Sequence, residues 1–158
     1  MVNKFYKILF ILFFIFIFAK SVLFAENNKD SFLISDYQIK KSLTDSLPNP
    51  ELGREIVISR RGNCLACHQV SSIDESFQGN IGPSLDGVAN RYSEGELRLR
   101  LVDPYSINPN SLMPAFFKKK GLNQVGNKFL GKTILTAQQI EDVISWLLTL
   151  KWNKENLY

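Results

Sequence analysis

The sequence predicts an all-α protein, with a few helices and long loops. Segments 50–60, 97–102 and 140–148 carry the start signals or the apolar spacing of helices, whereas convincing alternation of apolar and polar residues, typical of strands, is missing. Between the helices, residues 79–87 and 104–135 are punctuated by glycine and proline, which is typical of loops. The length of 158 residues suggests one domain plus a targeting segment.

Residues 1–25 have the layout of a secretory signal peptide. Lys4 and Lys7 precede an apolar run over 8–19, and Ala25 ends the segment with a small residue. A membrane anchor is the alternative, but the run of 12 apolar residues is shorter than the roughly 20 that cross a bilayer. We therefore expect residues 1–25 to be cleaved and the protein to be exported.

Removal of this segment brings the charge close to neutral. The chain has 19 Lys and Arg against 15 Asp and Glu; without Lys4, Lys7 and Lys20 the balance is 16 against 15, or +1. Nothing in this balance indicates a nucleic-acid partner. Residues 26–48 are polar and mixed, and we interpret them as an N-terminal arm or linker. The compact domain is expected over 49–152, followed by a tail over 153–158.

Each expected helix has an identifiable start. Asn49 precedes Pro50, and proline is favoured at the first helical position. Residues 93–96 form a capping box, and Thr136 with Gln139 forms another. The last helix then carries one apolar stripe at helical spacing, made of Ile140, Val143, Ile144, Leu147 and Leu148.

The chemistry of the chain centres on Cys64-Leu65-Ala66-Cys67-His68. This pattern is the attachment signature of c-type haem. Cysteines three residues apart lie on one side of a helical turn, where both sulfurs reach the vinyl groups of one haem. His68, the next residue, can bind the iron. We therefore predict one covalent haem c, held by Cys64 and Cys67.

Two cysteines in this spacing are also compatible with three other chemistries. A redox dithiol is expected in a thioredoxin-like βαβ context, which the sequence lacks. A tetrahedral zinc site would need Asp or Glu as its fourth ligand, because the chain holds two Cys and one His. A structural disulfide across two residues is uncommon and would leave His68 unexplained.

Elimination indicates Met113 as the second axial ligand. His68 is the only histidine, and Met113 is the only methionine after residues 1–25 are removed. A thioether suits a buried haem and favours reduced iron. The alternatives are that Met113 packs in the core while the sixth position is open or taken by lysine.

Polar and charged groups are expected around the haem. The carbonyl of Pro83, in a rigid Gly-Pro turn, is a candidate to orient His68 by accepting its second ring N–H, although a plain loop turn fits equally well. Arg91, Arg98 and Lys132 are either surface charges or partners of the haem propionates. The lysine run 118–120 either steers an acidic partner or is solvated.

Several blocks of residues carry a resemblance to a known family. The blocks are 62–68, 77–85, 94–103, 108–109, 113–114 and 131–143. On these blocks, about residues 50–150 resemble SoxX, the monohaem c-type cytochrome subunit of the SoxAX complex in sulfur oxidation. The haem motif alone indicates any c-type cytochrome, whereas blocks 94–103 and 131–143 are far more specific.

The resemblance implies a class I cytochrome c fold, a periplasmic location and a heterodimer with SoxA. It also implies axial ligation by His68 and Met113, and a carbonyl from Pro83 on the ligating histidine. The whole complex attaches thiosulfate oxidatively to a cysteine of the carrier SoxYZ, and its catalytic haem belongs to SoxA. This chain would then pass electrons to a soluble cytochrome, without a complete active site of its own.

Two functions stay open from the sequence. One is the electron-transfer subunit of the thiosulfate-oxidising complex, and the other is a free-standing periplasmic electron carrier. The haem chemistry serves both, and the blocks above favour the first. The arm at residues 26–48 matches the family least well, and its scattered apolar residues lead us to expect that it lies along the partner.

Overall fold

A computed structural model describes residues 32–122 and 124–152. The expected signal peptide at 1–25 and the expected tail at 153–158 lie outside these residues. Within the described part, four α-helices and three short 3-10 turns follow one another, and the only strand-like pairing is an isolated bridge between Ser35 and Gln38. None of the described helices is both long and apolar enough to cross a membrane. The predicted all-α class is confirmed.

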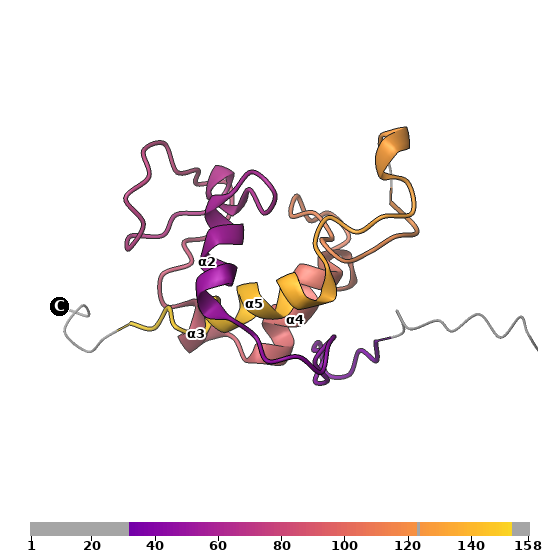
Figure 1. The fold of residues 1–158 in the computed structure, drawn as a ribbon, viewed down its shortest axis with the longest axis horizontal. Helices are drawn as coiled ribbons and strands as arrows, with labels where there is room; N and C mark the ends of the chain where they lie inside the picture. Colours follow the sequence, from indigo (N-terminus) through magenta and orange to yellow (C-terminus); the bar gives the residue numbers. More distant parts are fainter. Residues whose placement is uncertain (1–31, 123, 153–158) are drawn as a thin grey trace, which may run out of the picture. The chain divides into compact units, whose positions relative to one another are not determined.

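Helices α2 (Pro50–Ile58) and α5 (Ala137–Leu147) pack against each other at the centre of the fold (Figure 1). They approach closely at Gly53, where an added Cβ would lie only 2.0 Å from the backbone oxygen of Asp142. The start of α2 is also tied to α5, because Asn49 N donates to Asp142 Oδ1 over 2.8 Å. A side chain larger than hydrogen at position 53 would force the two helices apart.

Helix α4 (Glu94–Val102) packs on α5 and completes the helical core. Both predicted capping boxes are present, at Ser93 with Glu96 and at Thr136 with Gln139. The short helix α3 (Val88–Arg91) was not expected from the sequence. The buried core draws on all of these elements and includes Val57, Val88, Leu99, Val102, Leu135, Ile140, Val143 and Ile144.

Helix α2 ends two residues earlier than the sequence predicts. The hydroxyl of Ser59 donates to Ile56 O over 2.8 Å, and its backbone is extended with ψ of 160°. The extended backbone of Ser59 ends the helix, while its N–H still donates to Glu55 O over 2.9 Å. The chain then turns through residues 60–63 toward the cysteines.

Residues 32–48 belong to the same compact unit as the helices, and the expected division into an arm over 26–48 and a domain over 49–152 stays a prediction. Ile39 is buried, and its backbone N–H donates to Gly95 O over 3.0 Å. Leu43 N donates to Glu141 Oε1 over 2.9 Å. The arm is therefore packed on α4 and α5 by its backbone as much as by its side chains.

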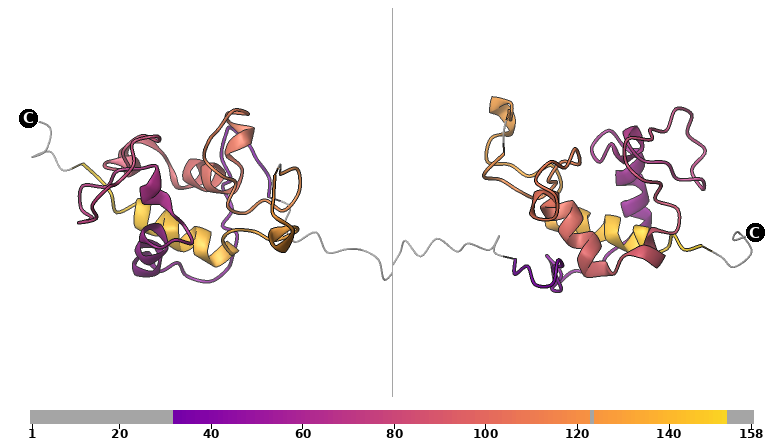
Figure 2. Two further views of the ribbon diagram at one scale, coloured as in Figure 1. Left: turned by 90° about the horizontal axis from the view of Figure 1, so that it is seen from above. Right: turned by 180° about the vertical axis from the view of Figure 1, so that it is seen from behind.

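Two loop systems project from the helices and are separated in all three views of Figures 1 and 2. The first, residues 59–87, carries the cysteines and includes the turn η1 (Cys64–Ala66). The second, residues 103–136, carries Met113 and includes η2 (Pro104–Ser106) and η3 (Asn127–Phe129). The predicted site residues thus lie on two different parts of the chain.

Candidate functional site

The two cysteines lie on a tight turn directly after helix α2. Asn63 adopts a left-handed conformation with φ of 51° and redirects the chain into η1. His68 N donates to Cys64 O over 2.9 Å, and Cys67 N donates to the same oxygen over 3.1 Å. Both thiols are free and half-buried. One turn therefore presents both sulfurs beside His68.

Burial raises the pKa of the Cys64 thiol to about 11. A hydrogen bond to its own backbone opposes this rise, whereas the nearby Cys67 increases it. Reactive dithiols work in the opposite direction, because they lower the pKa of the attacking thiol. The environment of Cys64 therefore fits a thiol held in an apolar setting better than a redox nucleophile.

His68 is held by the Gly82-Pro83 turn. Its Nδ1 lies 2.6 Å from Pro83 O. A carbonyl oxygen only accepts hydrogen bonds, so Nδ1 is the donor in this contact and Nε2 is the ring nitrogen left to face a metal. The contact expected from the sequence is thus present, and the role of Pro83 in ligand orientation stays a prediction.

Glycine at position 82 allows this approach. An added Cβ would lie 2.3 Å from Cε1 of His68, far inside the closest contact of real Cβ atoms. The backbone of the turn can therefore approach the imidazole this closely only because residue 82 has no side chain.

Met113 lies on the second loop system, where it is half-buried and packs against the hydrophobic core. Two backbone bonds fix the chain that follows it: Phe116 N donates to Leu101 O over 2.9 Å, and Leu135 N donates to Phe116 O over 3.0 Å. These bonds attach the Met113 segment to the end of α4 and to the approach of α5. Ligation of iron by Met113 stays a prediction.

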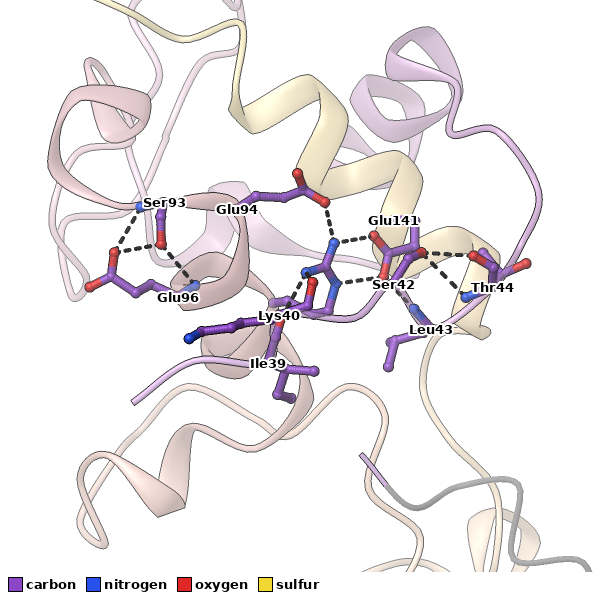
Figure 3. A network of polar contacts seen from close by, with 10 residues as sticks. Ile39, Lys40, Ser42, Leu43, Thr44, Ser93, Glu94, Glu96 and Glu141 are labelled. Carbon is purple, nitrogen blue, oxygen red and sulfur yellow. Dashed lines mark hydrogen bonds and ion pairs between the residues drawn. The ribbon is translucent and has the colours of Figure 1, made fainter. Parts of the chain in front are cut away.

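The structure contradicts the sequence interpretation of Arg98. We expected a surface charge or a propionate partner, but its side chain is fully buried. The guanidinium donates to Glu141 through Nε over 2.7 Å and through Nη2 over 2.8 Å, and it also pairs with Glu94. Its Nη1 donates to Ile39 O over 2.7 Å (Figure 3). Arg98 therefore joins α4, α5 and the arm, and it is engaged away from solvent.

The other cations of the candidate set lie at the surface. Arg91 is exposed and donates to Asp86 O and Ser84 O, each over 2.6 Å. Lys132 is exposed and its Nζ donates to Lys128 O over 3.0 Å. In the lysine run, Lys118 pairs with Asp103 over 2.7 Å. Propionate binding by Arg91 or Lys132 stays a prediction.

The side chains of the site fit a covalently held haem. Apolar groups on both loop systems pack against the core while remaining partly exposed, which leaves apolar surface for a large apolar group to cover; they include Leu65, Leu85, Met113 and Phe117. Among residues 32–122 and 124–152, no group of three or more His, Cys, Asp or Glu side chains could hold a metal ion between them.

Sequence reasoning missed the residues that support the Pro83 turn. Asp86 accepts hydrogen bonds from Ser71, which is 15 residues away in the chain. Gln78 binds the backbone of Val70 and Ile73 through its amide. The spacing of Ser84 and Asp86 is a weak turn signal, but nothing local points to Ser71 or Val70 as partners.

Comparison with known proteins defines the class. Residues 51–151 match the family model of cytochrome c, and this chain belongs to the cytochrome c family. Covalent attachment of haem c is the chemistry of this family. No curated protein matches the chain.

Among solved structures, the fold matches a chain in the crystal structure of SoxXA from P. pantotrophus. The two chains are 38% identical with a TM-score of 0.71, and the match covers 78% of this chain and 97% of that one. The resemblance to SoxX read from the sequence is confirmed, as is the class I cytochrome c fold. The chain is a SoxX-like electron-transfer cytochrome.

Proposed function

We propose that this chain is the electron-transfer subunit of a periplasmic SoxAX-type complex that oxidises thiosulfate. The observation that carries the proposal is the likeness to a SoxXA chain over nearly the full length of that chain. The expected signal peptide at 1–25 supports export. In this proposal the chain pairs with a SoxA partner, and the complex acts on the SoxYZ carrier.

One haem c, when bound, supplies an iron that accepts and releases a single electron. Cys64 and Cys67 would hold it through thioether bonds, each formed by addition of the S–H across a vinyl group of the haem. His68 Nε2 and the Met113 thioether would bind the iron, and the Pro83 carbonyl would hold the imidazole in place through its contact with Nδ1. Thioether ligation by Met113 favours the reduced state, which suits a subunit that collects electrons.

This chain would carry no complete active site. Both of its cysteines are committed to the haem, so no thiol is left to form a bond with thiosulfate. The proposed step for this subunit is therefore outer-sphere: one electron arrives from the partner and one leaves to a soluble cytochrome. Bond formation at sulfur belongs to the partner.

Haem attachment is tested first. The tagged full-length chain is expressed with c-type maturation, and the haem must stay with the protein in acid acetone, with one haem per chain by pyridine haemochrome. A chain with Cys64→Ser and Cys67→Ser is the matched control and should lose its haem in the same extraction. Retention of haem by the control would contradict thioether attachment.

The complex is tested by co-purification from the periplasm of the native host. We expect a stoichiometric second c-type cytochrome, and thiosulfate-dependent reduction of the haem when SoxYZ is present. A red protein that purifies alone and stays oxidised under these conditions would contradict the complex and favour a free-standing electron carrier.

A further inference from the structure

One carboxylate links the chain that follows His68 to the turn that holds its imidazole. Asp86 Oδ1 accepts from Ser71 N over 2.9 Å, and Oδ2 accepts from Ser71 Oγ over 2.6 Å. Oδ2 also accepts from Ser84 Oγ over 3.0 Å. Ser71 lies three residues after His68, and Ser84 directly follows Pro83. The carboxylate therefore bridges both sides of the His68–Pro83 contact.

The backbone alone holds only the two ends of this turn. Gly82 N donates to Cys67 O over 2.8 Å, and Leu85 N donates to Gln69 O over 2.9 Å. Between these bonds, Pro83 has no N–H to donate. The orientation of the Pro83 carbonyl thus depends on the side chains that fix the next residues.

Arg91 also forms hydrogen bonds with the same turn. Its guanidinium donates to Ser84 O and to Asp86 O, each over 2.6 Å. The ring of Trp152 lies against this guanidinium, with 5.5 Å between the Arg91 Cζ and the ring centroid. The turn is therefore held both by the Asp86 carboxylate and by the Arg91 guanidinium.

The carboxylate is ionised at neutral pH. Burial by itself would raise the pKa of Asp86, but the hydrogen bonds from Ser71 and Ser84 and the charge of Arg91 outweigh it and lower the pKa. Hydrogen bonds to an ionised acceptor are stronger than those between neutral groups. The hydrogen bonds that Asp86 accepts from Ser71 and Ser84 are therefore of this stronger, charge-assisted kind.

We propose that Asp86 is a positioning residue for His68: by fixing the Pro83 turn, it sets the strength of the His68–Pro83 contact and thereby the electron donation of the imidazole to the haem iron. The inference rests on the proposed ligation of iron by His68. A stronger bond at Nδ1 makes the imidazole a more basic ligand. A more basic ligand favours oxidised iron, so loosening the turn raises the reduction potential.

The test uses the haem-loaded chain with Asp86→Asn. Proton NMR follows the exchange of the His68 Nδ1–H with solvent and the spread of the haem-methyl shifts, and a redox titration gives the potential. If the turn loses the stabilisation of about one hydrogen bond, the His68 Nδ1–H should exchange with solvent about three- to tenfold faster. We also expect altered haem-methyl shifts and a higher potential.

Two matched variants separate positioning from charge. Asp74→Asn removes an exposed acid from the same loop and measures how much the potential rises from the loss of a negative charge alone. Ser71→Ala removes one donor to Asp86 and changes no charge. We expect Ser71→Ala to accelerate Nδ1–H exchange and Asp74→Asn to leave it unchanged.

The proposal is wrong if Asp86→Asn and Asp74→Asn raise the potential equally and neither changes the exchange of Nδ1–H. If Asp86→Asn does not mature, Ser71→Ala decides alone, and unchanged exchange in that variant overturns the proposal. A chain that attaches no haem even with the native sequence contradicts the proposed function instead, and its absorption spectrum shows this beforehand.

Discussion

The position of the His68 imidazole depends on the absence of a side chain at Gly82 as much as on the hydrogen bond to Pro83. The Pro83 carbonyl approaches to 2.6 Å only because Gly82 leaves room for the ring. The position of the imidazole is therefore set by three features of the chain: the cysteine turn that precedes it, and Gly82 and the Pro83 carbonyl on the facing turn.

Gly82→Ala is expected to displace this ring. The new Cβ would lie 2.3 Å from His68 Cε1, so the imidazole or the turn must move and the Nδ1 contact lengthens. We expect a raised reduction potential and a lower yield of haem-loaded protein. Gly126→Ala is the control, because φ there is −60° and the nearest atom to an added Cβ lies 3.8 Å away. Equal behaviour of the two variants in potential and yield would exclude steric control of His68 by Gly82.

Asp86 gives the chain a pH dependence of defined sign. Its pKa is lowered in the folded protein, so its ionised form stabilises the fold above the unfolded pKa of about 3.9. This stabilisation is lost as the pH falls below 4 through the lowered folded pKa. Asp86→Asn should therefore reduce the free energy of unfolding most at pH 7 and progressively less toward pH 3.

Urea unfolding of the haem-loaded chains at pH 7, 5 and 3.5 measures this difference. The pKa of Glu96 is lowered mainly by hydrogen bonds from the backbone and hydroxyl of Ser93 and contributes with the same sign. Because Glu96 is present in both chains, its contribution cancels in the comparison. A difference between the chains that stays constant from pH 7 to 3.5 would show that Asp86 does not stabilise the fold through its charge.

At the scale of the elements, the helices were predictable because their signals are local. The capping residues of α4 and α5 and the stripe of α5 lie within a few residues of one another, and the structure has them as expected. Arg98 was not predictable, since its burial comes from Glu141 and Ile39, which are 43 and 59 residues away. The Asp86–Ser71 bridge escaped prediction for the same reason.

The contact between α4 and α5 contains a buried ion pair. Arg98 and Glu141 have almost no exposed side-chain surface, whereas the side chain of Glu94 is 56% exposed. Burial would lower the pKa of Arg98, but the hydrogen bonds and charges of Glu141 and Glu94 outweigh it and raise the pKa. Arg98 therefore keeps its positive charge within the core.

Glu141→Ala should destabilise the chain by about 3–5 kcal/mol, because it leaves a buried guanidinium without its main partner. Glu94→Gln, on the exposed side, should cost no more than about 1 kcal/mol. Arg98→Met with Glu141→Leu should recover part of the loss, since neither charge is then buried. Urea midpoints followed by far-UV circular dichroism measure all three. Equal effects of Glu141→Ala and Glu94→Gln would show that burial of the pair is unimportant.

At the scale of the whole molecule, residues 32–48 of the N-terminal arm are a part of the cytochrome-like unit. Arg98 Nη1 donates to Ile39 O, and Glu141 Oε1 accepts from Leu43 N, so the same ion pair that joins α4 to α5 also holds the arm (Figure 3). Outside this anchor, Leu33 and Tyr37 are 88% and 71% exposed. The arm thus has an anchored part and a solvent-exposed part. Variants of the first test stability, and variants of the second test partner binding.

Deletion of residues 32–43, with the signal sequence kept, should lower the free energy of unfolding. Burial of Ile39 contributes about 1.5–3 kcal/mol, and each lost hydrogen bond to the ion pair adds about 1 kcal/mol. By contrast, Leu33→Ser with Tyr37→Ser should leave the urea midpoint unchanged, because both side chains face solvent. If the arm lies along the partner, this double variant weakens co-purification of the second cytochrome at unchanged stability. Unchanged affinity in both the deletion and the double variant would restrict the arm to a structural role, whereas an unchanged midpoint in the deletion would contradict the anchoring by Arg98 and Glu141.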